Sequence, residues 1–351
     1  MFMLAARLAA SNRNFMARVY IIAEAGVNHN GSVDLALQLV EAAKDCGADA
    51  VKFQTFRADR IASRSAAKAQ YQERQTGNAE SHFEMLQRLE LNAEAHRRLI
   101  DRCRQIDIEF LSSPFDEESV DLLDALGVSQ FKVPSGEVTN LPLLRHIASK
   151  GRPVILSTGM STLGEVEEAV LALQAKGTAP ITLLHCVTQY PAPYSEINLR
   201  AMQTLRAAFG LPVGYSDHTE GIEIAVAAVA MGAQVIEKHF TIDRSLPGPD
   251  HAASLEPAEL KRMVTAIRNV ESALGNGVKV PAPCEIPNIS VARKSLIAAR
   301  NLSAGHRLRA EDITIKRPGT GISPKFLQVL VGHTLRTDVK EDEVIHWNDL
   351  A

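Results

Sequence analysis

Cysteine is scarce in this sequence, and its placement excludes two structural roles. The four residues Cys46, Cys103, Cys186 and Cys284 are scattered, and no two of them form a CxxC pair. Such spacing offers neither a structural zinc site nor a disulfide framework. We therefore expect a protein of a reducing compartment, most simply the cytoplasm.

Long apolar runs and a strong net charge are also missing. No stretch approaches the ~20 uninterrupted apolar residues of a membrane helix. Lysine and arginine number 38 against 41 acidic residues, a net charge of −3, so neither nucleic acid nor an acidic membrane is an expected partner. With 46% apolar and 23% charged residues, the chain has enough apolar side chains to form a hydrophobic core, which excludes wholesale disorder. Its length of 351 residues predicts about two domains.

The first eighteen residues lack the features of a secretory signal. Their apolar stretch is short, is interrupted by Arg7 and has no basic lead-in. We expect residues 1–18 to be a loose N-terminal extension, or Met16 to be the true start.

A glycine-rich dinucleotide turn is absent as well, since Gly26–Gly31 does not have GxGxxG spacing. What the chain does have is eight short β-branched runs, each followed by a helix-like segment. The runs are Val19–Glu24, Ala50–Gln54, Glu109–Ser113, Gln130–Ser135, Val154–Thr158, Thr182–Val187, Val213–His218 and Val235–Phe240. The units span residues 19–274, which favours an α/β fold, a (β/α)8 TIM barrel, over an open sheet because such barrels take about 250 residues.

Three further segments complete the predicted organisation. After the second run, the polar tract Arg57–Ser81 is long enough to be a lid or binding loop. The barrel domain is placed at 19–275, followed by a Gly- and Pro-rich linker at 276–289. Residues 290–351 predict a small, mostly β module with a marginal core that docks on something else. Its strand candidates are Leu296–Ala299, Ile313–Lys316 and Glu343–His346.

Polar residues gather where the barrel strands end, which is the face that carries chemistry in this fold. Lys52 and Lys132 suit a phosphorylated anion, because ammonium groups supply point charges to phosphate. His218 and His239, on neighbouring strands, suit an exchangeable Zn²⁺, Mn²⁺ or Co²⁺, or else hydrogen-bond within the core. Either lysine could instead form a Schiff base in a metal-independent aldolase.

Ten segments of the chain, in order, resemble the sialic acid synthase family, which includes N-acetylneuraminate and N,N'-diacetyllegionaminate synthases. They are AEAGVNHNG (23–31), AVKFQTF (50–56), SSPFDEES (112–119), FKVPSGE (131–137), LSTGMST (156–162), HC–QYPAPY (within 185–194), GYSDHT (214–219), EKHF (237–240), PGPDH (247–251) and KRPGTGIS (316–323). The tail resembles the antifreeze-like (SAF) module of these enzymes, a small β-clip domain. The resemblance implies a domain-swapped homodimer in which this module reaches the partner's active site.

The resemblance also implies a reaction and a set of roles. Phosphoenolpyruvate would condense with an N-acylated mannosamine-type sugar, with C–O cleavage, phosphate release and a divalent metal (Mn²⁺, with Mg²⁺ or Co²⁺ as alternatives). Glu24 and Glu137 would be acid/base groups, and His218 and His239 would hold the metal. Phosphoenolpyruvate would contact Lys52, Ser113, Lys132, Ser135, Ser157, Thr188 and Ser216, and the sugar would contact Gln54, Tyr190, Asp250 and the partner's Arg317.

One segment departs from the N-acetylneuraminate branch. Family members that use N-acetylmannosamine often carry Asn after His-Cys, whereas this chain has Val187, Thr188 and Gln189. The following YPAP resembles enzymes that use 2,4-diacetamido-2,4,6-trideoxy-mannose, so both sugars stay open. Two other hypotheses remain beside the synthase: a Schiff-base pyruvate lyase on the same barrel, and a catalytically dead carbohydrate-binding protein.

Overall fold

The computed structural model describes residues 18–351 except residues 78 and 178. Of the predicted N-terminal extension, residues 1–18, all but Arg18 lie outside the described residues. The chain divides into two compact units, and the boundary falls between Asn276 and Gly277.

The first unit is built on an eight-stranded parallel sheet. Its strands are β1 (Tyr20–Gly26), β2 (Ala50–Thr55), β3 (Glu109–Pro114), β4 (Phe131–Val133), β5 (Val154–Ser157), β6 (Ile181–Cys186), β7 (Val213–Asp217) and β8 (Val235–His239). Hydrogen bonds connect them in the order β3-β2-β1-β8-β7-β6-β5-β4. The two terminal strands of this order, β3 and β4, lie against each other, so the sheet forms a near-closed barrel. The predicted TIM barrel is confirmed, and each of the eight predicted runs overlaps one of its strands.

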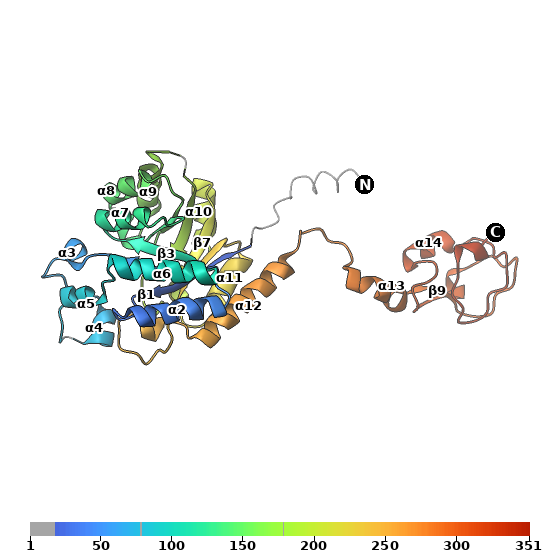
Figure 1. The fold of residues 1–351 in the computed structure, drawn as a ribbon. Coiled ribbons are helices and arrows are strands. Elements are labelled where there is room, and N and C mark those ends of the chain that lie inside the picture. Colours follow the sequence, from blue (N-terminus) through green and yellow to red (C-terminus); the bar gives the residue numbers. More distant parts are fainter. Residues whose placement is uncertain (1–17, 78, 178) are drawn as a thin grey trace. The chain divides into compact units, whose positions relative to one another are not determined.

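Helices follow the strands and cover the outside of the barrel (Figure 1). They are α2 (Val33–Asp45), α6 (Ala93–Ile106), α7 (Glu117–Ala125), α8 (Leu141–Ala148), α9 (Leu163–Gln174), α10 (Ala201–Phe209), α11 (Glu223–Ala230) and α12 (Pro257–Leu274). Polar residues begin several of them: Ser32 caps α2, and Thr162 with Glu165 forms a capping box on α9. The main core lies between the strands and these helices. None of the helices in the described part of the chain has the length and apolar content to cross a membrane.

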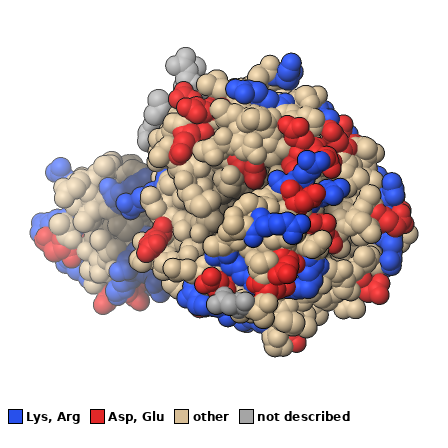
Figure 2. Space-filling model, turned by 90° about the vertical axis from the view of Figure 1, so that its left-hand side faces the viewer, with Lys and Arg blue, Asp and Glu red and all other residues tan. Residues whose placement is uncertain are grey.

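The predicted polar tract Arg57–Ser81 contains two short helices, α3 (Ala58–Ile61) and α4 (Gln70–Thr76), and α5 (His82–Leu89) follows directly after it. Figure 1 shows the three helices grouped at one end of the first unit. Basic and acidic side chains are interspersed over the face of the molecule seen from that end (Figure 2). We call residues 57–90 the insertion.

The second unit has its own small core of buried leucine, isoleucine, valine and alanine side chains. It contains α13 (Ile286–Ala292), the antiparallel strands β9 (Ser295–Ala298) and β10 (Ile313–Lys316), and α14 (Leu327–Leu330). The segment predicted as a linker, 276–289, includes a 3-10 helix (Pro283–Glu285) and the start of α13. One expectation needs correction: the predicted strand Glu343–His346 is only a single β-bridge, from Val344 to Ile297. A tight turn before this segment, with Asp342 at positive φ, and a 3-10 helix after it (Trp347–Asp349) leave no room for a longer ladder.

Candidate active site

The interior of the barrel changes from apolar to polar within two residues along each strand. Six buried apolar side chains from six strands fill one layer: Ile22, Ala50, Leu111, Ile155, Leu184 and Val235. Because side chains in a strand alternate between faces, the residue two positions later points to the same interior. Those residues are Glu24, Lys52, Ser113, Ser157, Cys186 and Glu237, and all six line one cavity.

This cavity of about 320 Å³ gathers most of the residues that the sequence singles out. Thirteen of them line it: Glu24, Gln54, Lys52, Ser113, Lys132, Ser135, Ser157, Thr188, Tyr190, Ser216, His218, His239 and Asp250. They come from all eight strands or the loops that follow them. The side chains lie close together because the carboxyl ends of parallel strands meet at one rim.

Two buried lysines form the positively charged part of the cavity, and Lys52 is the more strongly paired of them. Its Nζ lies 2.7 Å from Glu24 Oε2 and 3.7 Å from Glu237 Oε2, and it donates to Ser113 Oγ at 3.0 Å. Burial favours the neutral amine, but the two carboxylates outweigh it and raise the pKa of Lys52. Lys52 therefore stays an ammonium.

Lys132 has fewer partners than Lys52. Its Nζ lies 3.2 Å from Glu237 Oε1, the same oxygen that accepts a hydrogen bond from Ser216 at 2.8 Å. Burial lowers the pKa of Lys132, and Glu237 opposes that shift only in part. Burial disfavours the charged form of Glu237 too, yet Lys132 and Lys52 hold its pKa at about 2. Glu237 is thus the permanent anion of this group.

Glu24 is the adjustable charge of the group. Burial, reinforced by Glu237 and opposed by Lys52, raises the pKa of Glu24 to about 7. A carboxyl group that titrates near neutral pH can take up or release a proton during a reaction. The cavity floor thus combines two lysines with one fixed carboxylate and one carboxyl group that titrates near neutral pH.

Unpaired hydroxyl groups stand beside this charge. Ser157 Oγ and Thr188 Oγ1 are buried, and neither has a hydrogen-bond partner among the described residues. Nearby, Ser135 Oγ accepts from the backbone N–H of Gly159 at 2.9 Å, and a Cβ on Gly159 would lie only 2.4 Å from Thr188 Oγ1. Buried hydroxyl groups normally have a hydrogen-bond partner. Because those of Ser157 and Thr188 have none among the described residues, both can donate to a bound anion.

His218 and His239 lie side by side at the ends of β7 and β8. Their ring centroids are 5.4 Å apart, and the Tyr190 ring lies 4.1 Å from His218 and 5.5 Å from His239. Nδ1 of His218 lies 2.7 Å from the carbonyl of Val187, so it donates there and leaves Nε2 as the ligand atom. Nδ1 of His239 is buried without a hydrogen-bond partner in the described chain, 4.0 Å from Asp250 Oδ2.

These donors fit an exchangeable catalytic metal better than a structural one. Burial, His218 and Lys52 lower the pKa of His239 well below its ordinary value, so its imidazole is neutral, as a metal ligand must be. Burial also raises the pKa of Asp250 to about 6. Among the described residues no three His, Cys, Asp or Glu side chains form a ready metal-binding group. Two imidazoles leave coordination positions for water and substrate.

Two of the predicted site residues lie elsewhere. Glu137 does not line the cavity; it follows β4 in a 3-10 turn, and its Oε2 accepts a hydrogen bond from Asn140 Nδ2 at 2.7 Å. Arg317 belongs to the second unit, where its Nε donates to the carbonyl of Ala292 at 3.1 Å and its side chain is exposed.

The sequence matches known proteins over most of its length. The NeuB family matches residues 39–279, and the SAF domain matches residues 293–351. The chain belongs to the NeuB family. It is 52% identical to the N,N'-diacetyllegionaminic acid synthase of Campylobacter jejuni, over 94% of this chain and 99% of that protein. It is 48% identical to the protein of the same name from Legionella pneumophila, over 94% of each.

A solved structure agrees with these relatives. The N-acetylneuraminic acid (sialic acid) synthetase of Leptospira borgpetersenii superimposes with a TM-score of 0.69 at 37% identity, covering 78% of this chain and 90% of that one. The resemblance stated from the motifs is confirmed. As a NeuB-family chain, the protein is an enzyme of the transferase type.

Sequence reasoning missed one functional residue of this NeuB-family site. Glu237 pairs with both lysines, yet the sequence analysis gives it no role. In the structure Lys238 points away from the cavity and pairs with Asp217 at 2.8 Å. Strand alternation contains the signal: once His239 faces the interior, Glu237 must face it too and Lys238 cannot.

A second feature that the sequence did not specify is an apolar wall. One hydrophobic cluster is separate from the barrel cores, and each of its members lines the cavity. We call this cluster the apolar wall; it consists of Val27, Phe56, Ile61, Met85, Leu86, Leu89 and Phe115. Four of the seven belong to α3 and α5, so the insertion does contribute to the cavity, together with Tyr71 and Gln72 of α4.

Proposed function

We propose that this enzyme condenses phosphoenolpyruvate with an N-acylated mannosamine-type aldehyde to give a nine-carbon 2-keto acid and phosphate. One observation carries the proposal. Two buried ammonium groups, Lys52 and Lys132, share a cavity with the unpaired hydroxyls of Ser157 and Thr188. A substrate that carries phosphate and carboxylate groups would satisfy all four.

For the sugar, we propose 2,4-diacetamido-2,4,6-trideoxy-mannose, with N-acetylmannosamine as the poorer substrate. The names of the two relatives from Campylobacter and Legionella support this choice, as does the sequence from Val187 to Pro193, which departs from the N-acetylneuraminate branch. Gln54, Tyr190 and Asp250 line the cavity and are proposed to contact the sugar.

We also propose that the enzyme requires a divalent metal, Mn²⁺ with Mg²⁺ or Co²⁺ as alternatives. The unpaired Nδ1 of buried His239 and the Nε2 of His218 support it, because both nitrogens lie at the cavity. When bound, such a metal would polarise the aldehyde oxygen of the sugar as a Lewis acid.

The residues of the floor have defined tasks in this reaction. C3 of phosphoenolpyruvate forms a bond to the aldehyde carbon as the π bond of the aldehyde breaks, and the aldehyde oxygen takes up a proton to become a hydroxyl. Positive charge develops at C2, and water adds there with loss of a proton. Phosphate then leaves with cleavage of its C2–O bond, while the new C2 hydroxyl gives up its proton and becomes the keto group. Lys52 and Lys132 hold the phosphate and carboxylate and orient the enol. Glu24, whose pKa is about 7, would receive the proton of the attacking water. Glu137 lies outside the cavity, so it could act as an acid or base only if the loop around it moved toward the substrate.

Arg317 is proposed to complete the sugar site of a partner chain in a dimer. Its exposed side chain is compatible with such a contact. Arg317→Ala should raise the KM of the sugar far more than that of phosphoenolpyruvate. Mixing this variant with Lys52→Ala should restore activity, because each mixed dimer has one intact site. Verified mixed dimers that stay inactive would place Arg317 outside any shared site.

The proposal is tested by measuring phosphate release. We expect release only when phosphoenolpyruvate and a sugar are both present, faster with the diacetamido sugar, abolished by chelation and restored by Mn²⁺. Release that survives exhaustive chelation would exclude the metal. Borohydride trapping distinguishes the Schiff-base alternative, in which Lys52 or Lys132 would be the nucleophile. A pyruvate adduct on either lysine would support that alternative against the synthase.

A protein without turnover that still binds sugar would instead be the catalytically dead carbohydrate-binding protein. The intact set of paired charges in the cavity argues against that alternative, because buried ammonium groups are costly without a use.

A further inference from the structure

One face of α5 is exposed to the cavity along its whole length. His82, Met85, Leu86 and Leu89 all line it, and their spacing of i, i+3, i+4 and i+7 places them in a single stripe on the helix. The stripe begins with one polar side chain and continues with three apolar ones. It therefore offers a ligand a hydrogen-bonding group and, one turn further, an apolar surface.

The polar member of the stripe has no partner of its own. Nδ1 of His82 is buried and has no hydrogen bond to any described residue. Burial lowers the pKa of His82, and the nearby Lys68 ammonium lowers it further, so the ring is neutral at neutral pH. A neutral imidazole can donate or accept one hydrogen bond at this nitrogen. A buried nitrogen without a partner, on a side chain that lines a cavity, is a place where a ligand gains affinity.

The apolar members are held in place by the rest of the wall. Met85 and Leu89 are 1% exposed and pack with Phe56, which follows β2. The Tyr71 ring of α4 also lines the cavity and lies 4.9 Å from Tyr190, whose ring is tilted against that of His218 at 4.1 Å. The insertion is thus connected to the paired histidines through two aromatic rings.

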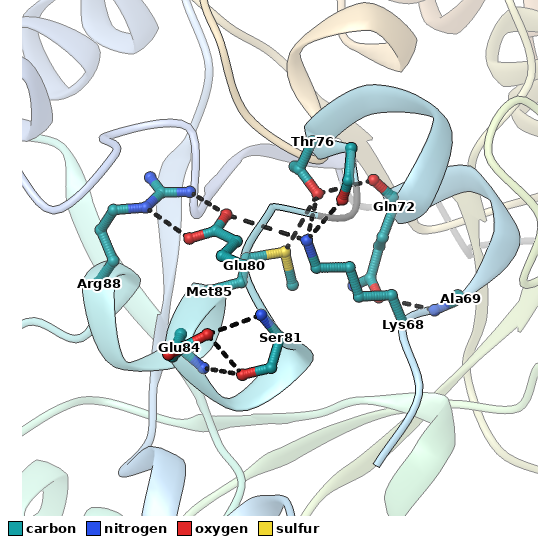
Figure 3. A network of polar contacts seen from close by, with 10 residues as sticks. Lys68, Ala69, Gln72, Thr76, Glu80, Ser81, Glu84, Met85 and Arg88 are labelled. Atoms are coloured by element: carbon teal, nitrogen blue, oxygen red, sulfur yellow. Dashed lines mark hydrogen bonds and ion pairs between the residues drawn. The ribbon is translucent and has the colours of Figure 1, made fainter. Parts of the chain in front are cut away.

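A buried lysine fastens α4 to α5 and fixes the orientation of the stripe (Figure 3). Lys68 Nζ donates to Thr76 Oγ1 at 2.8 Å and to the carbonyl of Gly77 at 2.9 Å, and lies 4.0 Å from Glu80. Glu80 in turn pairs with Arg88 of α5 at 2.9 Å. The side chain of Lys68 is 4% exposed, so the lysine itself is shielded from water, whereas Glu80 and Arg88 are partly exposed. Such shielding favours a preorganised binding surface over a loose loop.

We propose that the stripe on α5 binds an acetamido group of the sugar, with His82 hydrogen-bonded to the amide and Met85 and Leu86 in contact with the methyl group. This inference rests on the proposed function and names the part of the sugar that the insertion recognises. An acetamido group has one amide dipole and one methyl, the same order of polar and apolar surface that the stripe presents.

The position of the acetamido group on the sugar follows from the placement of the stripe. The reacting aldehyde carbon must lie at the strand ends, near His218 and the lysines. A substituent on the adjacent C2 stays near these strand ends, whereas one on C4 extends away from them toward the insertion. The stripe is therefore assigned to the 4-acetamido group, which N-acetylmannosamine lacks.

The test compares two sugars that differ only at C4. They are 2,4-diacetamido-2,4,6-trideoxy-mannose and 2-acetamido-2,6-dideoxy-mannose, the second with a hydroxyl in place of the acetamido group. His82→Phe and Met85→Ser should each lower kcat/KM for the diacetamido sugar about tenfold, the effect of one lost hydrogen bond or one lost methyl contact. The monoacetamido sugar should lose less than twofold, and the KM of phosphoenolpyruvate should not change. Gln87→Leu, on the exposed face of the same helix, is the matched control and should leave both sugars unaffected.

Each outcome decides between the inference and the proposed function. Equal losses for the two sugars, or no loss for either, overturn the assignment of α5 while leaving the synthase reaction intact. If the wild-type enzyme turns over neither sugar, the proposed function fails for these substrates. Calorimetric measurement of sugar binding then tests the inference by itself. The wild type should bind the diacetamido sugar more tightly than the monoacetamido sugar, and His82→Phe should bind the two sugars with equal affinity. Equal affinities of the wild type for the two sugars overturn the inference.

Discussion

The floor of the cavity and its apolar wall are built in opposite ways. The floor consists of charged and hydroxyl side chains on the strand ends of the barrel, where each group is fixed by the sheet and by ion pairs such as Lys52 to Glu24. The wall comes largely from short helices of the insertion, which do not belong to the sheet and are held by side chains such as Lys68.

This difference separates two tasks. Charges that must act on a reacting centre need positions fixed by a rigid scaffold, and the barrel strands supply it. Recognition of a variable substituent needs a surface that can change without disturbing the reaction, and an insertion supplies that. We therefore expect changes in the floor to affect every sugar and changes in the wall to affect only some.

The largest effect is expected from Lys52→Met. The variant removes an ammonium that the floor uses to hold the anion, so kcat/KM should fall about 10³-fold with both sugars alike. Phosphate release with each sugar is the measurement. A loss confined to one sugar would contradict the separation of floor and wall.

Glu24→Gln should have the next largest effect, about 10²-fold or more on kcat, and it should change the pH profile. The pKa of Glu24 is raised to about 7, so the wild-type rate should decline as the pH falls below 7 and the carboxylate is protonated. The glutamine variant should lose this limb. If the rate of the Glu24→Gln variant still declines at low pH, with a midpoint near pH 6, that decline is assigned to Asp250, whose pKa is about 6. A limb near 7 that persists unchanged would remove Glu24 from proton transfer.

Glu237→Gln should mainly affect stability, by about 3 kcal/mol in the free energy of unfolding, because it leaves buried Lys132 without its carboxylate. The folded-state pKa of Glu237 is about 2, below its ordinary value of 4.5. Its contribution is thus complete above pH 4.5 and is lost as the pH falls toward 2. Denaturant unfolding should show that the difference in free energy of unfolding between wild type and variant becomes smaller as the pH falls from 4.5 toward 2. Exposed Glu167→Gln is the control, and a gap independent of pH would be evidence against the ion pair.

The smallest effect is expected from Lys68→Met, which loosens the wall without touching the floor. The KM of the sugar should rise about three- to tenfold, at an unchanged kcat and an unchanged KM of phosphoenolpyruvate. Lys68→Arg should restore most of the loss, since it can still donate to Thr76 and Gly77. Exposed Lys176→Met is the control. A fall in kcat with an unchanged sugar KM would show that the insertion serves the reaction rather than recognition.

The sequence predicted the floor far better than the wall. Strand ends can be located from short β-branched runs, and the barrel rule then brings Lys52, Lys132, His218 and His239 to one rim although they are far apart in the chain. The sequence did not point to Glu237, because its ion pairs are with Lys52 and Lys132 on two other strands and a pattern within one strand does not show them. The segment Glu343–His346 was wrongly predicted as a strand because its apolar residues meet single partners rather than a ladder.

By itself, the sequence determined the order of strands and helices, the barrel and the kinds of groups at its mouth, because alternation, caps and short buried runs are local properties. Only the tertiary structure decided which groups meet. The pKa of Glu24 and the direction of Lys238 depend on neighbours that lie many residues away along the chain. The stripe on α5 shows the same limit: its helical spacing is visible in the sequence, but packing of the insertion over the strand ends turns that face toward the cavity.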